Sequence, residues 1–269
     1  MKTIAITGAT SGIGLATSEA LLEKGNKLFF LVRNVDKAKN IISDWKQKEN
    51  VSIIECDLAD LKSVKKASQT LLEKTDHLDV LINNAGGTFQ ERKESKDGFE
   101  LHLAVNHLGH FLLTKQIFTL LEKSNTKVIN VSSEAHRAAK PDWSDLNLKN
   151  KYSAILGYAN AKLYNILFTK SLVDKGISSY ALHPGVINSG FGDSLPSVLK
   201  IMWNLGKPFM KTTREGASTS IYLATNELSA DKNGEYFKDK KVKKATSLAN
   251  SSAARERLWE ESEKMIASL

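Results

Sequence analysis

Six short apolar runs, rich in β-branched and aromatic residues, recur through the first two thirds of the chain. The runs are TIAIT (3–7), KLFFLV (27–32), VSIIEC (51–56), LDVLIN (78–83), KVINVS (127–132) and ISSYAL (177–182). Continuous apolar runs of this length are typical of strands that are buried on both faces. They predict strands in the interior of a sheet.

Between these runs, apolar residues recur at helical spacing. One face is marked by Ala38, Ile41, Ile42 and Trp45, and another by Leu61, Val64, Ala67, Leu71 and Leu72. Asp60 stands where the cap of the second helix belongs. Strands that alternate with helices form parallel sheets through right-handed crossovers. We therefore predict an α/β fold, a doubly wound Rossmann sheet of seven mostly parallel strands with helices on both faces.

The strand rhythm fades after residue 183. Residues 190–212 have the pattern of a loop and a short amphipathic helix, and residues 251–267 have that of a last helix. No repeat and no linker rich in Gly, Pro or Ser divides the sequence. We expect residues 1–269 to form a single domain.

The composition narrows the class of protein. The 269 residues are 41% apolar and 25% charged, which suits a folded domain with a sizeable core. One cysteine, Cys56, excludes a disulfide within the chain and suits a reducing, cytoplasmic setting. We find no signal sequence and no integral membrane segment. The net charge of +8 is spread out and has no nucleic-acid motif behind it, so we interpret it as a solvated surface.

A glycine-rich turn, TGATSGIG (7–14), lies between the first predicted strand and the helix after it. Gly8 permits a tight turn, Gly12 lets the main chain approach a phosphate, and Gly14 lets the helix pack on the strand. The start of the helix offers free amide groups and the positive end of the helix dipole to a pyrophosphate. The motif therefore indicates a dinucleotide site.

Further motifs follow the glycine turn in a fixed order. They are CDLAD (56–60), NNAG (83–86), NHLGHFLLT (106–114), INVSS (129–133), YANAK (158–162), HPGVINS (183–189), GEYF (234–237) and RLWEESEKM (257–265). With these motifs the chain resembles the short-chain dehydrogenase/reductase family over nearly its whole length. The resemblance is to the retinol-dehydrogenase-like and protochlorophyllide-reductase-like branch. It implies an oxidoreductase that uses a nicotinamide cofactor.

The resemblance also implies the cofactor contacts. Asp57 would accept a hydrogen bond from the adenine amino group, whereas Asn84 would tie neighbouring strands together. The remaining implied contacts are Thr10, Ser11 and Ile13 with the three glycines, Leu58, Asn83, Ala85 and Gly86 near the adenosine, and Pro184, Gly185, Val186, Ile187 and Ser189 near the nicotinamide.

The end of the second predicted strand bears on the choice of cofactor. NAD-binding folds place an acidic residue there to hold the ribose hydroxyls. The sequence has Arg33 instead, and a guanidinium suits a 2′-phosphate. Asn34 could add a hydrogen bond, and we expect Asp36 to cap the next helix. These residues predict NADP(H) rather than NAD(H).

Tyr158 and Lys162 lie four positions apart, on one face of a predicted helix. A free tyrosine has a pKa near ~10, and a neighbouring ammonium would lower it toward neutral pH. The lysine could also hold the nicotinamide ribose. The resemblance adds Ser133, which would face the substrate while Ser132 points into the fold. It also adds Asn106, which would hold a water that connects to Lys162.

Two segments are expected to shape the substrate side. Residues 134–156 are interpreted as an inserted rim loop, with Tyr152 as a rim residue. The apolar residues between Gly190 and Lys211 predict a lid over a medium-sized lipophilic aldehyde, ketone or alcohol. Packing of these residues on the core or on a second subunit, in a homodimer, is the alternative.

Three functions are weighed against one another. The first is an NADP(H)-dependent oxidoreductase that interconverts an alcohol and a carbonyl. The others are a catalytically idle NADP-binding sensor or scaffold, and a reductase of carbon–carbon double bonds. A metal site is not predicted, because the histidines follow no ligand pattern. This holds for His102, His107, His110, His136 and His183.

Overall fold

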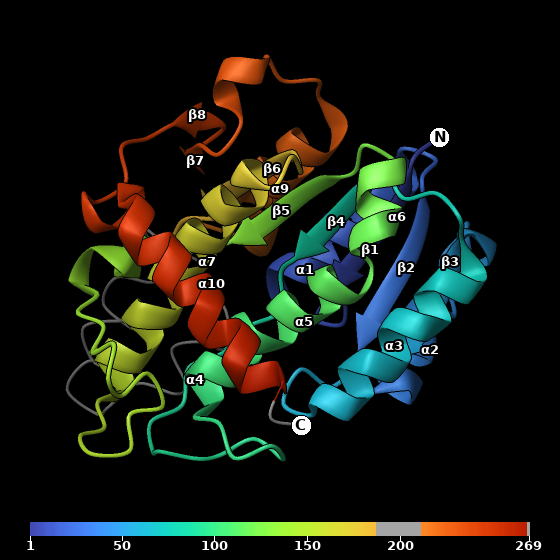
Figure 1. Ribbon diagram of the computed structural model, residues 1–269. Coiled ribbons are helices and arrows are strands. Elements are labelled where there is room, and N and C mark those ends of the chain that lie inside the picture. Colours follow the sequence, from blue (N-terminus) through green and yellow to red (C-terminus); the bar gives the residue numbers. More distant parts are fainter. Residues whose placement is uncertain (187–210, 268–269) are drawn as a thin grey trace.

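Eight strands form one sheet in the part of the protein that the structure, a computed structural model, describes: residues 1–186 and 211–267 (Figure 1). Their order is β3-β2-β1-β4-β5-β6-β7-β8, and all neighbours are parallel except β7 and β8. The strands are β1 (Thr3–Thr7), β2 (Lys27–Val32), β3 (Val51–Glu55), β4 (Val80–Asn83), β5 (Lys127–Val131), β6 (Ser179–His183), β7 (Tyr236–Lys238) and β8 (Lys241–Val242). The predicted α/β Rossmann fold is confirmed, with one strand more than the seven expected.

The last two strands form a tight hairpin. The residues between them, Asp239 and Lys240, both have positive φ angles of 53° and 62°, as a type I′ turn requires. The strands have only three and two residues. Segments this short leave no alternating pattern to recognise, which is why the sequence did not predict the hairpin.

Helices connect the strands, and one more helix follows the last strand. The α-helices are α1 (Gly12–Glu23), α2 (Val35–Ile42), α3 (Leu61–Lys74), α4 (Leu101–Leu103), α5 (Gly109–Gln116), α6 (Phe118–Lys123), α7 (Ala154–Asp174), α9 (Thr213–Thr225) and α10 (Ser252–Ala267). A π-helical turn, η2 (Ala104–Leu108), joins α4 to α5. Short 3₁₀ turns are η1 (Lys48–Asn50), η3 (Glu134–Ala138), η6 (Ala230–Lys232) and η7 (Leu248–Asn250).

Two of the helix starts test the predicted caps. Asp60 caps α3, as predicted, and accepts the amide hydrogens of Lys62 and Ser63. The prediction that Asp36 caps α2 is wrong. The cap is Asn34, whose side-chain oxygen accepts the Lys37 amide at 2.8 Å, and Asp36 lies in the first turn. Asparagine and aspartate cap equally well, so the sequence alone did not distinguish them.

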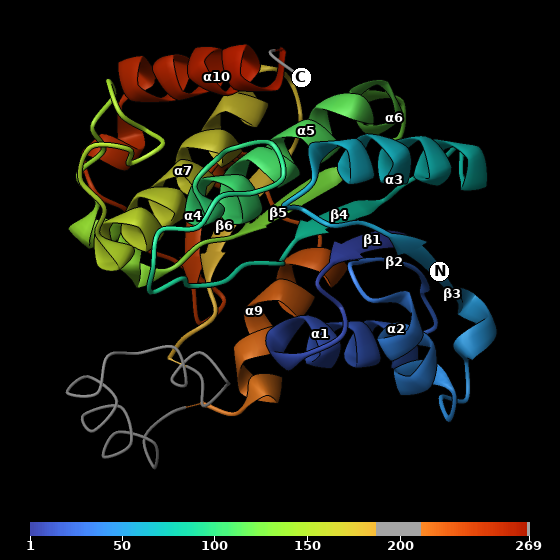
Figure 2. The same cartoon turned by 90° about the horizontal axis from the view of Figure 1, so that it is seen from below.

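The helices cover both faces of the sheet. Figure 2 shows α1, α2 and α9 on one face, and α3, α5, α6, α7 and α10 on the other. Alternate residues of a strand pack into the two core layers, one on each face of the sheet, because successive side chains point to opposite faces. In β2, Phe29 and Leu31 pack with the α3 and α5 layer, while Leu28 and Phe30 pack with the α1 and α9 layer.

The C-terminal helix α10 lies across α7 and α5 (Figure 1). Trp259 fastens it, with ring centres 4.8 Å from Phe111 and 6.2 Å from Phe168. Within the described residues, no helix combines the length and the apolar character needed to cross a bilayer.

The strand order reverses between β1 and β4. The chain runs outward from β1 through β2 to β3, then returns to the other side of β1 to form β4. At such a reversal the connections leave in opposite directions and open a crevice at the carboxyl ends of the strands. Most of the predicted cofactor residues, and Ser133, follow the ends of β1 to β6 at this edge, whereas Asn106 lies in η2, and Tyr158 and Lys162 lie on α7.

Candidate active site

The glycine turn after β1 has a shape that larger residues could not adopt. Gly8 has a φ of 70°, and a Cβ there would lie 2.9 Å from the Cα of Ala85. A Cβ at Gly14 would lie 2.2 Å from the Gly8 carbonyl oxygen. At Gly12 φ is 54°, and no described atom lies within 4 Å of the Cβ position. The start of α1 therefore presents bare main chain to open space, which fits the pyrophosphate of a dinucleotide.

Thr7 joins the ends of β1 and β4 beneath this turn. Its hydroxyl oxygen accepts the amide hydrogens of Asn84 at 3.0 Å and Ala85 at 2.9 Å. The Asn84 side chain donates back to the Thr7 carbonyl at 2.8 Å. Asn84 thus ties the two strands together and fixes Ala85 and Gly86 at the edge of the crevice.

Two residues expected near the adenosine are turned inward. The Asn83 side chain is buried and donates to Asn130 at 2.9 Å and Thr114 at 3.3 Å, which leaves only its main chain for a contact with the cofactor. The Leu58 side chain packs in the core, which leaves only its main chain near the crevice. Asp57 is partly exposed after β3, and its carboxylate accepts the Ala59 amide at 3.0 Å. That bond orients the carboxylate at the carboxyl end of the strand.

Arg33 follows the last residue of β2 and is exposed. Among the described residues, no acidic side chain forms an ion pair with it. The neighbouring Asn34 uses its side-chain oxygen to cap α2, which leaves its amide nitrogen available to an anion. The positive charge of Arg33 is thus displayed at the edge where the sequence analysis expects a 2′-phosphate.

Helix α7 brings Tyr158 and Lys162 to the end of β5. The Lys162 side chain is only 4% exposed, and its Nζ donates to the Val131 carbonyl at 3.0 Å. The same nitrogen lies 5.6 Å from the centre of the Tyr158 ring. Ser132 donates to the Lys162 carbonyl at 2.6 Å and so fastens the helix to the strand.

The two serines after β5 point in different directions. Ser132 is buried against α7, whereas Ser133 is partly exposed. The Ser133 hydroxyl accepts the Ala135 amide at 3.2 Å and is hydrogen-bonded to the hydroxyl of Tyr158. Of the two, Ser133 therefore shares a polar site with Tyr158.

Burial controls the protonation of the site. It raises the pKa of Tyr158 to about 12, although the hydrogen bond with Ser133 acts in the opposite direction. It also lowers the pKa of Lys162 to about 8. We expected the ammonium to bring the pKa of the tyrosine toward neutral pH, but in this structure the loss of hydration dominates, and only the Ser133 hydrogen bond lowers that pKa. At pH 7 Tyr158 keeps its proton and Lys162 keeps its charge.

Asn106 is buried in the π-helical turn. Its amide accepts the Gly87 amide hydrogen at 3.1 Å and donates to the Gly87 carbonyl at 3.1 Å. A Cβ at Gly86 would lie 2.5 Å from the Asn106 oxygen and 3.3 Å from the Lys162 nitrogen. Asn106 and Lys162 therefore meet at Gly86, and the proposed water between them stays a prediction.

The segment after β6 lies next to the end of β5, at the same edge of the sheet. Gly185 has a φ of 103°, and the Val186 carbonyl accepts the Lys211 amide at 2.9 Å. Pro184 and Gly185 are partly exposed, and Val186 is exposed. Ile187, Ser189 and the expected lid lie outside the described residues.

A buried acidic and histidine pair, Glu100 and His102, lies beside the site and was not predicted from the sequence. The His102 ring lies 6.2 Å from that of Tyr158, measured between centres, and is inaccessible to solvent. A carboxylate directly before an apolar helix is a typical cap signal, so Glu100 could have been recognised. The contact of His102 with Tyr158 could not, because it joins residues distant in the sequence.

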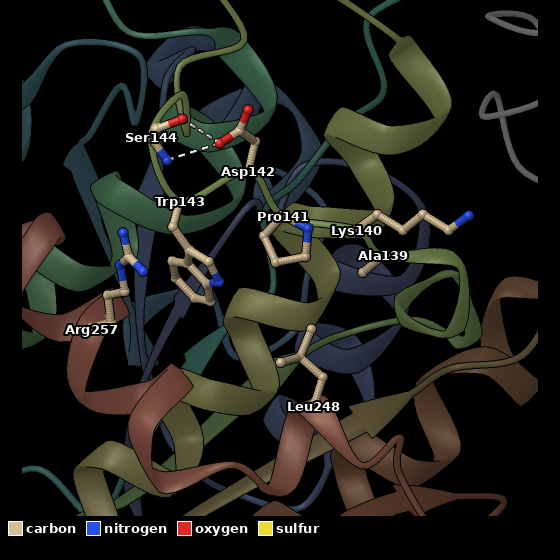
Figure 3. Close-up of a pocket in the computed structure, with 8 residues that line it drawn as sticks. All are labelled: Ala139, Lys140, Pro141, Asp142, Trp143, Ser144, Leu248 and Arg257. Carbon is tan, nitrogen blue, oxygen red and sulfur yellow. Dashed lines mark hydrogen bonds between the residues drawn. The ribbon is translucent and has the colours of Figure 1, made fainter.

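A separate surface hollow lies between the rim loop and α10 (Figure 3). It is lined by Ala139, Lys140, Pro141, Asp142, Trp143, Ser144, Leu248 and Arg257. None of these is a predicted catalytic residue, and the Arg257 guanidinium lies 5.5 Å from the centre of the Trp143 ring. In the described part of the chain, no cluster of three or more His, Cys, Asp or Glu residues could hold a metal ion.

The buried charge of Lys162 should cost stability. Its pKa falls from a usual 10.5 to about 8, so the unfolded chain binds more protons between these pH values, and stability rises with pH across that window. Lys162→Met should raise the free energy of unfolding at pH 7 by about 1–3 kcal/mol. The gain should vanish near pH 10.5, as measured by urea unfolding. Lys170→Met on the same helix is the control, and a Lys162→Met variant less stable than wild type at pH 7 would contradict the argument.

Comparisons with known proteins identify the family of this chain. The family model described as short chain dehydrogenase matches residues 2–197. Retinol dehydrogenase 12 of Homo sapiens is 38% identical, over 96% of this chain and 84% of its own. Retinol dehydrogenase 14 of Mus musculus is 35% identical, over 98% and 86%. The crystal structure of an uncharacterized protein from Mycobacterium Paratuberculosis superposes with a TM-score of 0.79 at 29% identity, covering 98% of this chain and 93% of that one. The chain therefore belongs to the short-chain dehydrogenase/reductase family of oxidoreductases.

Proposed function

We propose that the protein is an NADP(H)-dependent oxidoreductase that interconverts an alcohol and a carbonyl on a lipophilic small molecule. The observation that carries the proposal is the polar group at the end of β5. There the hydroxyls of Ser133 and Tyr158 are hydrogen-bonded beside the buried ammonium of Lys162. This group can bind a substrate oxygen and exchange a proton with it.

Each residue has a distinct task in carbonyl reduction. The reduced nicotinamide supplies the hydride when it is bound. Tyr158 supplies the proton to the carbonyl oxygen, since its raised pKa keeps it protonated at neutral pH. Ser133 donates a hydrogen bond to the same oxygen and orients it. Lys162 stabilises the phenolate that remains after the proton leaves.

The preference for NADP(H) rests on Arg33. Its guanidinium is exposed after β2, where an acidic residue would be needed to bind the ribose hydroxyls of NAD. A planar cation can form paired hydrogen bonds with a phosphate, which a 2′-phosphate provides. Asn34 lies beside it with its amide nitrogen available.

The lipophilic substrate is supported from two sides. The relatives named above are retinol dehydrogenases, and retinol is an apolar alcohol. In this chain, the half-buried Phe89 follows β4, and its ring lies against Gly87, where a Cβ would be 3.3 Å from it. An aromatic wall next to the crevice favours an apolar substrate.

A catalytically idle sensor is a weaker explanation. A sensor could use Lys162 to hold the nicotinamide ribose, but it gains nothing from the hydrogen-bonded hydroxyls of Ser133 and Tyr158 beside that ammonium. A reductase of carbon–carbon double bonds would instead turn over conjugated alkenes and leave simple aldehydes unreduced.

Removing the proton donor should stop turnover and leave cofactor binding intact. Tyr158→Phe should lower kcat by about 10²–10⁴-fold, because proton transfer to the substrate oxygen is lost. Ser133→Ala should also lower kcat. The dissociation constant of NADPH, followed by fluorescence titration, should change by less than about twofold, since the phenyl ring still fills the site.

The matched control for Ser133 is its neighbour. Ser132→Ala removes a hydroxyl that bonds only to the helix, so it should affect stability more than kcat. Near-normal kcat in Tyr158→Phe, or equal kcat losses in the two serine variants, would refute the assigned roles.

Reversing the charge at the end of β2 should reverse the cofactor preference. Arg33→Asp should lower kcat/KM for NADPH relative to NADH by about 10²-fold or more, because a carboxylate repels the 2′-phosphate and accepts hydrogen bonds from the ribose. Steady-state kinetics with both cofactors measure the ratio. Lys37→Asp, an exposed change of the same charge nearby, is the control. An unchanged ratio in Arg33→Asp would remove the arginine from cofactor selection.

A series of straight-chain aldehydes should reveal the apolar site. Each added methylene should improve kcat/KM by up to about 0.8 kcal/mol, or about fourfold, until the site is full. NADPH oxidation in the presence of each aldehyde is the measurement. A flat series with better turnover of a sugar would contradict the lipophilic assignment, and turnover only of conjugated alkenes would favour the double-bond reductase.

A further inference from the structure

A carboxylate is buried at the start of the helical segment that contains Asn106. Glu100 is 1% exposed and caps α4, where its side chain accepts the amide hydrogens of His102 at 2.9 Å and Leu103 at 3.0 Å. Its Oε1 also lies 2.7 Å from Nδ1 of His102. A buried carboxylate with three donors is well satisfied, so its position is firmly defined.

The other nitrogen of His102 identifies the tautomer. Nε2 accepts the amide hydrogen of Phe89 at 3.0 Å, and an accepting nitrogen carries no proton. The proton of a neutral ring therefore sits on Nδ1, where it is donated to Glu100. A carboxylate on one side of the ring and a backbone amide on the other fix both its orientation and its tautomer.

Phe89 is held from a second direction. Its carbonyl accepts the hydroxyl of Tyr152 at 2.6 Å, and the Tyr152 ring stacks on His102 at 6.4 Å between centres. Two positions earlier, both backbone groups of Gly87 are bonded to Asn106. The strand β4 thus continues into a segment whose backbone is held in place at residues 87 and 89.

The same histidine reaches the proposed proton donor. Its ring meets that of Tyr158 edge to face, with centres 6.2 Å apart and planes at 63°. At the preceding position, a Cβ on Gly157 would lie 2.9 Å from Nδ1 of His102. Helix α7 approaches closely enough for this contact because residue 157 is a glycine.

We propose that His102, oriented by Glu100, is a positioning residue that fixes two parts of the active site at once. It holds the main chain at Phe89, so that the Phe89 ring forms a defined wall of the substrate site, and it supports the ring of Tyr158. His102 and Glu100 do not take part in the chemistry. The inference rests on the proposed function, because it assigns a substrate wall and a proton donor to that reaction.

The test compares three substitutions in one helical segment. His102→Leu keeps the bulk but can neither accept from Phe89 nor donate to Glu100. It should lower kcat/KM for a medium-chain aldehyde by about 10–100-fold, since small misplacements of reacting groups are costly. His102→Gln, which can still accept the Phe89 amide, should recover most of this loss. His107→Leu is the control, because His107 is equally buried on the same segment but faces Ser262 on α10.

A second experiment tests whether the Phe89 ring forms a wall of the substrate site. Tyr152→Phe removes only the hydroxyl that holds the Phe89 carbonyl, and it should flatten the dependence of kcat/KM on aldehyde length while changing the dissociation constant of NADPH by less than about twofold. Similar losses in His102→Leu and His107→Leu, or no rescue by glutamine, would overturn the proposal and assign His102 to the core.

A third arm does not depend on turnover. Nitrogen NMR of the wild-type protein should find the proton of His102 on Nδ1, and the Phe89 amide should exchange with solvent much faster in His102→Leu than in His107→Leu. A proton on Nε2, or equal exchange rates, would overturn the positioning role. If wild type reduces no carbonyl while these NMR results hold, the proposed function fails and the hydrogen-bond arrangement stands.

Discussion

A positive charge held inside the protein is the constraint on which the site depends. The Lys162 ammonium has lost nearly all contact with water, and the Val131 carbonyl accepts one of its hydrogens. Loss of hydration favours a neutral amine, so the charge survives at pH 7 only by a small margin. The end of β5, the start of η3 and the middle of α7 must therefore keep their positions together. The bond from Ser132 to the Lys162 carbonyl serves that purpose.

The proposed cofactor half of the site was accessible to sequence reasoning because it is built from main chain. A turn with positive φ at Gly8 and close packing at Gly14 both require glycine, and this requirement leaves a visible spacing. The strands were also predictable, since residues buried on both faces produce continuous apolar runs. The hairpin of β7 and β8 was not predicted, because strands of three and two residues are too short to show an alternating apolar pattern.

The proposed substrate half was harder to predict because side chains from distant segments build it. Asn83 and Asn84 are chemically identical neighbours, and only the direction of the strand sends one into the core and the other toward β1. The protonation of Tyr158 depends on how completely it is covered, which the spacing to Lys162 does not reveal. The Glu100 and His102 pair acts on a backbone amide thirteen positions away from the histidine. Short sequence motifs are thus enough to identify the family, whereas the shape of the proposed substrate site depends on contacts that form only in the folded chain.

The buried imidazoles make the stability of the fold sensitive to acid. Burial lowers the pKa of His107 and His110 to about 3 and that of His183 to about 4, and it lowers the pKa of His136 as well. In the unfolded chain each of these rings takes up a proton near pH ~6.5. Below that pH the unfolded state binds protons that the folded state does not, and each ring lowers stability by up to about 1.4 kcal/mol per pH unit until its folded-state pKa is reached. Four such groups act together, so stability falls as the pH drops below ~6.5, before most carboxylates, with usual pKa values of about 4, take up protons.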